Sequence, residues 1–307
     1  MEKRKIGSLD VSVVGLGCNN FGGRLDAQAT KVVVDAAIEK GINFFDTADM
    51  YGGTKSEEFL GLALGKRRDD VIVATKFGHK VSEEKQGARP EYIRQAIEDS
   101  LRRLGTDRID LYQLHKPDES VPIADTLGAL DELVKAGKVR EIGASNFSAA
   151  QLRRAEEAVT AGASRFVSLQ NEYSLLKREY EADVLPEALK QGVAFLPYFP
   201  LASGLLTGKY RQGQAKPEGT RLKADNPALN DDNLAIVEAL IQFSETRGHT
   251  ILELAFSWLA SRPTVASVIA GATSAQQIEG NAAAVNWKLS EADLAEIDAI
   301  LAPKPSG

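Results

Sequence analysis

The sequence has one cysteine, Cys18, in 307 residues, so no disulfide bond can form within the chain. It has no run of 18 apolar residues, which excludes a transmembrane helix of ordinary length. The first eight residues, Met-Glu-Lys-Arg-Lys-Ile-Gly-Ser, contain no apolar signal segment. These absences together indicate a cytoplasmic protein without a membrane partner.

Positive charge is also scarce, with 37 basic residues against 43 acidic ones and a net charge of -6. Because no basic stripe is available to neutralise phosphates, nucleic acid is not an expected partner. Hydrophobic residues make up 43% and charged residues 26% of the chain, as in ordinary soluble proteins with a sizeable core. No heptad repeat or exposed apolar stripe is visible, so we expect a monomer.

Eight short apolar runs, rich in β-branched residues, recur along the chain and predict strands. They cover residues 13–16, 42–45, 71–74, 109–112, 140–143, 166–169, 193–196 and 266–269.

Amphipathic stretches between these runs predict helices, several of which end at a glycine. Ser56 and Ser148 are expected to cap two of them, and Pro90 and Pro122 to open two others. The predicted helices cover residues 27–40, 56–64, 90–104, 122–136, 148–161, 179–191, 250–260 and 274–284.

The alternation of eight strands and helices predicts a (β/α)8 TIM barrel, which we expect to form a single domain over residues 1–307. A β-hairpin at residues 4–12 and extra helices at 231–246 and 290–301 fall outside the repeat. The long connection at 198–232 is expected to be functional. The competing doubly wound sheet usually opens with G-x-G-x-x-G, which residues 15–22 do not spell.

Four chemically distinct side chains follow successive strands of this barrel. Asp46, Lys76 and His115 end or follow the second, third and fourth predicted strands, and Tyr51 lies in the loop after the second. Each residue taken singly has an ordinary structural role, such as a cap or a solvated side chain. All four at successive strand ends, where barrel enzymes carry their sites, indicate a catalytic group.

The predicted chemistry is protonation of a carbonyl oxygen. A free tyrosine has a pKa of about 10, and a lysine ammonium within hydrogen-bond reach of Tyr51 would lower it. Asp46 would keep Lys76 charged, and His115 would donate a hydrogen bond to the carbonyl oxygen.

Histidine is too scarce for a metal-dependent barrel hydrolase, which needs several histidine and carboxylate ligands at strand ends. Of the three histidines, only His115 follows a predicted strand. We place His79 in a loop near the mouth of the site and His249 at a helix start, and predict no metal.

Three long segments, residues 41–52, 104–115 and 137–147, carry a resemblance to the aldo-keto reductase family that extends over essentially the whole chain. The resemblance implies a barrel with an extended nicotinamide cofactor across its top and Tyr51 as the proton donor. It further implies an enzyme that transfers hydride between NAD(P)H and an aldehyde or ketone. The alternative is a cofactor-binding sensor that resembles the potassium-channel β-subunit.

The resemblance also implies the residues that bind the cofactor. Ser145, Asn146 and Gln170 would hold the nicotinamide carboxamide, because amides and hydroxyls match its donor and acceptor. Tyr198 would stack on the nicotinamide ring. Near the phosphates we expect Pro200, Leu201, Ala202, Ser203, Lys209 and Arg221.

The last cofactor segment is expected at the start of the final barrel helix, whose N-terminus favours a phosphate. It contains Gly271, and Thr273, Gln277 and Asn281 fall on one helical face. Many family members have arginine or lysine near Thr273 and Gln277, and some have an acidic residue at Gly280. With Arg221 as the one obvious charge, NADP(H) is favoured and NAD(H) stays open.

The substrate is predicted to be a small-molecule carbonyl compound or alcohol, bound in a shallow, open pocket suited to varied or bulky carbonyls. The loop after His115 is short, and no long C-terminal arm follows the last helix. The expected pocket residues are Asn20, Phe21, Met50, Phe77 and Phe199.

Overall fold

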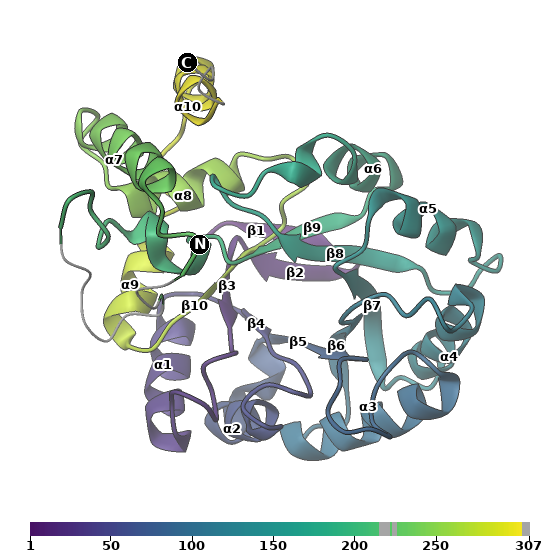
Figure 1. Ribbon diagram of the computed structural model, residues 1–307. Helices are drawn as coiled ribbons and strands as arrows, with labels where there is room; N and C mark the ends of the chain where they lie inside the picture. The colour runs from purple at the N-terminus through teal and green to yellow at the C-terminus, as the bar shows by residue number, and fades with distance from the viewer. Residues whose placement is uncertain (215–221, 223–225, 303–307) are drawn as a thin grey trace.

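The computed structural model describes residues 1–214, 222 and 226–302. Its centre is a closed barrel of eight parallel strands in the order β10-β3-β4-β5-β6-β7-β8-β9 (Figure 1). The predicted TIM barrel is therefore confirmed. The barrel strands are β3 Val14–Gly17, β4 Phe44–Asp46, β5 Ile72–Phe77, β6 Ile109–Leu114, β7 Val139–Ser145, β8 Phe166–Glu172, β9 Ala194–Tyr198 and β10 Val268–Gly271.

Helices surround the barrel, and α7, α8 and α10 gather at one side of it (Figure 1). The α-helices are α1 Ala27–Glu39, α2 Lys55–Leu64, α3 Pro90–Leu104, α4 Ile123–Lys135, α5 Ala149–Glu157, α6 Val184–Gln191, α7 Asp231–Glu245, α8 Ile251–Ala260, α9 Ala275–Ala283 and α10 Glu291–Leu301. Short 3-10 helices are η1 Gly65–Asp70, η2 Glu179–Glu181 and η3 Ala202–Thr207.

The predicted N-terminal hairpin is present as β1 Lys3–Ile6 and β2 Leu9–Ser12, paired antiparallel. Its apolar side chains Ile6, Leu9 and Val11 are fully buried and join a core cluster with Phe44 of β4 and Leu111 of β6. The hairpin therefore fills the end of the barrel where the strands begin. The opposite end, where the strands finish, is left for the site.

Most helix predictions are correct to within one or two residues, and two differ. The stretch predicted at 148–161 ends as a helix at Glu157, and the stretch at 179–191 divides into η2 and α6. Ser148 caps α5 through a capping box, as expected. Ser56 is not a cap: α2 begins after Thr54, and the Ser56 hydroxyl donates to the Cys18 carbonyl instead.

Among the described residues, no helix is both long and apolar enough to cross a membrane.

Candidate active site

The four residues Asp46, Tyr51, Lys76 and His115, which we call the tetrad, meet at the carboxyl end of the barrel. Asp46 is the last residue of β4, and Lys76 lies near the end of β5. His115 follows the last residue of β6, and Tyr51 lies in the connection between β4 and α2. All except Lys76 line one cavity, and Lys76 is completely buried beneath it.

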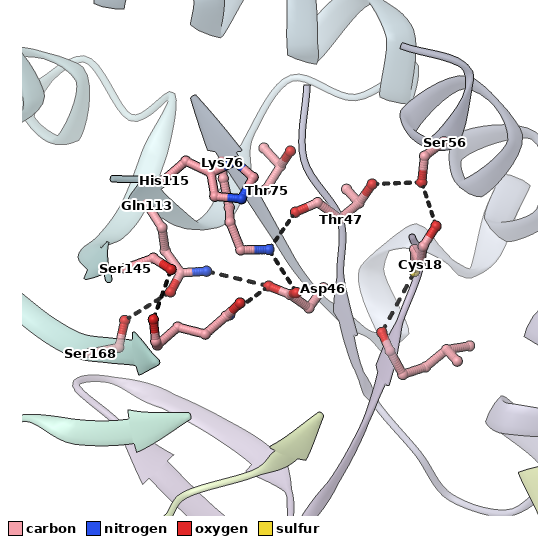
Figure 2. A network of polar contacts seen from close by, with 12 residues as sticks. Cys18, Asp46, Thr47, Ser56, Thr75, Lys76, Gln113, His115, Ser145 and Ser168 are labelled. Atoms are coloured by element: carbon pink, nitrogen blue, oxygen red, sulfur yellow. Dashed lines mark hydrogen bonds and ion pairs between the residues drawn. The ribbon is translucent and has the colours of Figure 1, made fainter. Parts of the chain in front are cut away.

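A buried ion pair forms the base of this group. Lys76 Nζ lies 2.7 Å from Asp46 Oδ2 and donates a second hydrogen bond, of 2.9 Å, to the Thr47 carbonyl (Figure 2). Burial by itself would lower the pKa of Lys76, but the adjacent Asp46 carboxylate raises it above its usual value. Lys76 is therefore an ammonium at neutral pH.

The other carboxylate oxygen of Asp46 accepts from two amides. Gln170 Nε2 lies 2.9 Å and Gln113 Nε2 3.3 Å from Asp46 Oδ1. With both oxygens paired, the buried carboxylate is fixed in orientation.

Tyr51 lies over this pair, with Lys76 Nζ 5.2 Å from the centre of its ring. Burial raises the pKa of Tyr51, and the ammonium of Lys76 opposes that rise without cancelling it. Lys76 therefore acts on the pKa of Tyr51 in the expected direction, but burial outweighs it, and the pKa stays above its usual value. The phenol is protonated at neutral pH, as a proton donor must be.

His115 meets the Tyr51 ring edge-on, at 5.8 Å between ring centres and an interplanar angle of 80°. Burial lowers the pKa of His115 to about 2, and the nearby charge of Lys76 adds to the effect. The centre of the His79 ring lies 5.4 Å from that of the His115 ring. His79 also lines the cavity, as expected for a residue at its mouth. His115 is thus a neutral imidazole beside the phenol.

The cavity has a volume of about 1090 Å³ and extends from the tetrad across β7 to β10 as far as α9. Most of the expected cofactor residues line it. Ala202 does not, although its neighbours do, and Arg221 lies outside the described residues. The expected residues that line it are Ser145, Asn146, Gln170, Tyr198, Pro200, Leu201, Ser203, Lys209, Gly271, Thr273, Gln277 and Asn281.

A chain of hydrogen bonds fixes the polar wall of the cavity next to the tetrad. Tyr198 OH donates to Asn146 Oδ1 at 2.8 Å, and Asn146 Nδ2 donates to the His115 carbonyl at 2.9 Å. Ser145 Oγ donates to the carbonyl of Gln170 at 2.7 Å. The wall therefore connects β6, β7, β8 and β9.

Strained backbone gathers at Asn146 of this wall and in the segment that follows β9. Asn146, Phe199, Ala202 and Ser203 all have positive φ angles, between 45° and 62°. Non-glycine residues seldom adopt this region, and such strain is concentrated at functional sites.

Two of the predicted substrate residues line the cavity and three do not. Asn20 and Phe199 are in its wall. Phe21 and Phe77 are fully buried in the core, and Phe77 stacks on Tyr112 at 4.7 Å. Successive strand residues point to opposite faces, so Phe77, next to Lys76, points away from the barrel interior.

Met50 is the third of these. It is partly exposed but is not part of the cavity wall.

Gln113 is a site residue that the sequence analysis missed. It lies within β6, beside Lys76 in register, and reaches Asp46 because Gly143 of β7 leaves room. A Cβ at Gly143 would lie 2.1 Å from Ser168 Oγ and 3.2 Å from Gln113 Cγ. The sequence shows a glycine at position 143, but only the register of the strands shows that it lies beside Gln113.

Other missed residues line the cavity itself. They come from strand-end connections, from η3 and from the first turns of α8 and α9, and include Asn19, Arg24, Lys116, Thr207, Leu252 and Gln276.

Comparison with known proteins identifies the class. The profile of the aldo/keto reductase family matches residues 13–302, so the chain belongs to this oxidoreductase family. A solved glycerol dehydrogenase from Gluconobacter oxydans superposes with a TM-score of 0.85 at 30% identity, covering 99% of this chain and 98% of that one.

Curated relatives are similar along nearly their whole length. "Aldo-keto reductase YhdN" of Bacillus subtilis is 35% identical, over 95% of this chain and 91% of its own. A "Probable voltage-gated potassium channel subunit beta" of Arabidopsis thaliana is 34% identical, over 99% of this chain and 98% of its own.

Proposed function

We propose that this protein reduces aldehydes or ketones to alcohols with NAD(P)H, or runs the reverse reaction, and that the tetrad is its catalytic group. The observation that carries the proposal is the buried Lys76–Asp46 pair beneath the protonated phenol of Tyr51. Such a pair supplies a fixed positive charge next to a proton donor, where a carbonyl oxygen gains negative charge during reduction.

Three observations support a nicotinamide cofactor in the large cavity. Its volume is far greater than a small carbonyl substrate needs. The polar wall of Ser145, Asn146 and Gln170 presents hydroxyl and amide groups suited to a carboxamide, and the Tyr198 ring lines the same wall. At the far end, Thr273 just before α9 and Gln277 and Asn281 within α9 line the cavity. NADP(H) is favoured, and NAD(H) is compatible.

When bound, this cofactor supplies or accepts the hydride. The residues of the chain handle the proton. Tyr51 donates its phenolic proton to the carbonyl oxygen as that oxygen gains negative charge, and Lys76 stabilises the phenolate that remains. Asp46 keeps Lys76 charged, since a buried ammonium without a partner would lose its proton. His115, neutral at physiological pH, donates a hydrogen bond that orients the carbonyl.

The test is cofactor oxidation followed at 340 nm, with NADPH and NADH, against a panel of aldehydes, ketones and sugars. Tyr51→Phe removes only the hydroxyl that donates the proton. We expect it to lower turnover by about 10²-fold or more while it still binds the cofactor. Equal turnover in both proteins would refute the catalytic role of Tyr51.

A second candidate function is a cofactor-binding sensor that turns over slowly and acts through a partner protein. The observation that favours this second function is the similarity to the probable potassium channel subunit of Arabidopsis thaliana. Tight NADPH binding without turnover on any carbonyl of the panel would support this function. Failure to bind either cofactor would refute both.

A further inference from the structure

The fixed charges that the described residues place around the cavity are nearly all of one sign. Four charged residues of this part of the chain line it, and the one acid among those four, Asp46, is already paired with buried Lys76. The other three are the cations Arg24, Lys116 and Lys209. The described wall of the cavity is therefore positive, although the protein as a whole has a net charge of -6.

None of these three cations has a counter-ion among the residues that the structure describes. Arg24 and Lys116 are exposed, and neither forms an ion pair with any residue that the structure describes. The acids that follow Lys116 already have partners: Asp118 accepts from the Ala88 amide and the Ser120 hydroxyl, and Glu119 pairs with Arg154 at 2.9 Å. Both cations are thus free to attract an anion.

Their place in the barrel separates them from most of the proposed cofactor wall. Arg24 lies between β3 and α1, and Lys116 between β6 and α4, whereas that wall is built on β7 to β10. In barrel order, the loops of Tyr51 and His79 come between the two cations. The cations therefore stand on either side of the reacting end of the cavity.

His79 adds a polar group to this half. Its Nδ1 is buried and has no hydrogen-bond partner among the described residues. Since its ring lies 5.4 Å from that of His115, a molecule that reaches the tetrad passes close to it.

We propose that the preferred substrate is an anionic carbonyl compound, whose carboxylate or phosphate group is held by Arg24 and Lys116 while its carbonyl reaches Tyr51. This inference rests on the proposed reductase function and names the substrate class of the same site. Long-range attraction by unpaired cations at a cavity mouth raises the local concentration of an anionic substrate. Neutral aldehydes enter the same cavity, but their local concentration is not raised by these charges.

The test compares matched substrates. 4-Carboxybenzaldehyde and methyl 4-formylbenzoate differ in charge but present the same aldehyde, and glyceraldehyde 3-phosphate and glyceraldehyde form a second pair. We expect kcat/KM to be higher for the anionic member, chiefly through KM, and the preference to shrink as salt is raised from 0.01 to 0.5 M. The two pairs distinguish a carboxylate from a phosphate as the preferred group.

The variants Arg24→Met and Lys116→Met remove one charge each. Exposed ion pairs are weak, so we expect each to lower the anion-to-neutral ratio of kcat/KM about threefold, and the double variant about tenfold. Lys66→Met, in η1 before β5 at the other end of the barrel, removes the same charge and should leave the ratio unchanged.

Two outcomes would overturn the inference. One is an equal kcat/KM for anionic and neutral partners. The other is a ratio unchanged in the double variant together with a weakened NADPH dissociation constant, measured by fluorescence quenching, which would assign the cations to the cofactor. If the protein turned over no carbonyl at all, the reductase function itself would be refuted. That result is distinct from both outcomes above.

Discussion

Lys76 Nζ and Asp46 Oδ2 lie 2.7 Å apart, with the two side chains 0% and 4% exposed, although 30 positions separate them in the sequence. Two opposite charges removed from water in this way depend on each other. The pair also acts on the pKa of Tyr51 above it, where the Lys76 ammonium opposes the rise that burial causes. Stability and chemistry are therefore coupled at this point.

Removal of one partner should show that coupling. Lys76→Met leaves Asp46 buried without a counter-charge, and we expect a loss of about 3–5 kcal/mol in the free energy of unfolding. Adding Asp46→Asn removes the uncompensated charge and should recover at least half of that loss, with turnover still absent. Urea denaturation at pH 7 measures the stability of both variants. A double variant as unstable as the single one would contradict the explanation.

His115 should remain neutral far below its ordinary range. Because its folded-state pKa is about 2, the unfolded chain binds a proton below a pH of about 6.5 while the folded chain does not. The contribution of His115 to stability is therefore present above that pH and is lost as the pH falls.

NMR of the histidine imidazole resonances between pH 4 and 8 measures the protonation state of His115. The signal that disappears in His115→Asn should stay at its neutral position throughout. A midpoint near the ordinary value would show that the site is more solvated than the structure indicates.

Asp49 should weaken the fold at alkaline pH. Burial and the nearby Glu57 raise the pKa of Asp49 to about 7, and its Oδ1 has no hydrogen-bond partner among the described residues. A raised folded-state pKa favours the fold at low pH, and this contribution is lost as the pH rises through about 7.

Asp49→Asn removes this penalty. We expect it to stabilise the protein by roughly 1–3 kcal/mol at alkaline pH, and by less in acid, where the native carboxyl is protonated. Thermal melting at pH 4.5 and pH 8 gives the comparison. An equal change in Tm at both values would exclude ionisation of Asp49 as the cause.

Tyr198 offers a way to separate stacking from hydrogen bonding. Tyr198→Phe loses the 2.8 Å bond to Asn146 and keeps the ring, whereas Tyr198→Ala loses both. If the ring stacks on a nicotinamide, Tyr198→Ala should weaken NADPH binding by a further 0.5–1.5 kcal/mol or about 2- to 13-fold. Fluorescence titration measures both dissociation constants. Equal constants for the two variants would mean that the ring makes no such contact.

The sequence located the tetrad because each member has a local signal. Apolar runs mark the barrel strands, and barrel sites form where strands end, so Asp46, Lys76 and His115 could be placed from spacing alone. Gln113 has no such signal, since it lies within an apolar strand and its partner Asp46 is 67 positions away.

The predictions for Phe21 and Phe77 failed for a related reason. Both lie next to site residues in the sequence, yet both are in the core. For Phe77, at the end of β5, the reason is that neighbouring side chains of a strand point to opposite faces. Phe21 lies in the connection between β3 and α1, where the direction of a side chain is set by the packing of the loop.

The sequence by itself determined the alternation of strands and helices, the hairpin, and the four residue types at the strand ends, because these depend on local periodicity and on the order of elements. The tertiary structure alone decided which charges are buried, and so which groups hold or lose protons. Burial keeps His115 neutral and Tyr51 protonated, and barrel closure places Gln170 on Asp46 across 124 positions. Desolvation is a property of the assembled surroundings, and no stretch of sequence contains it.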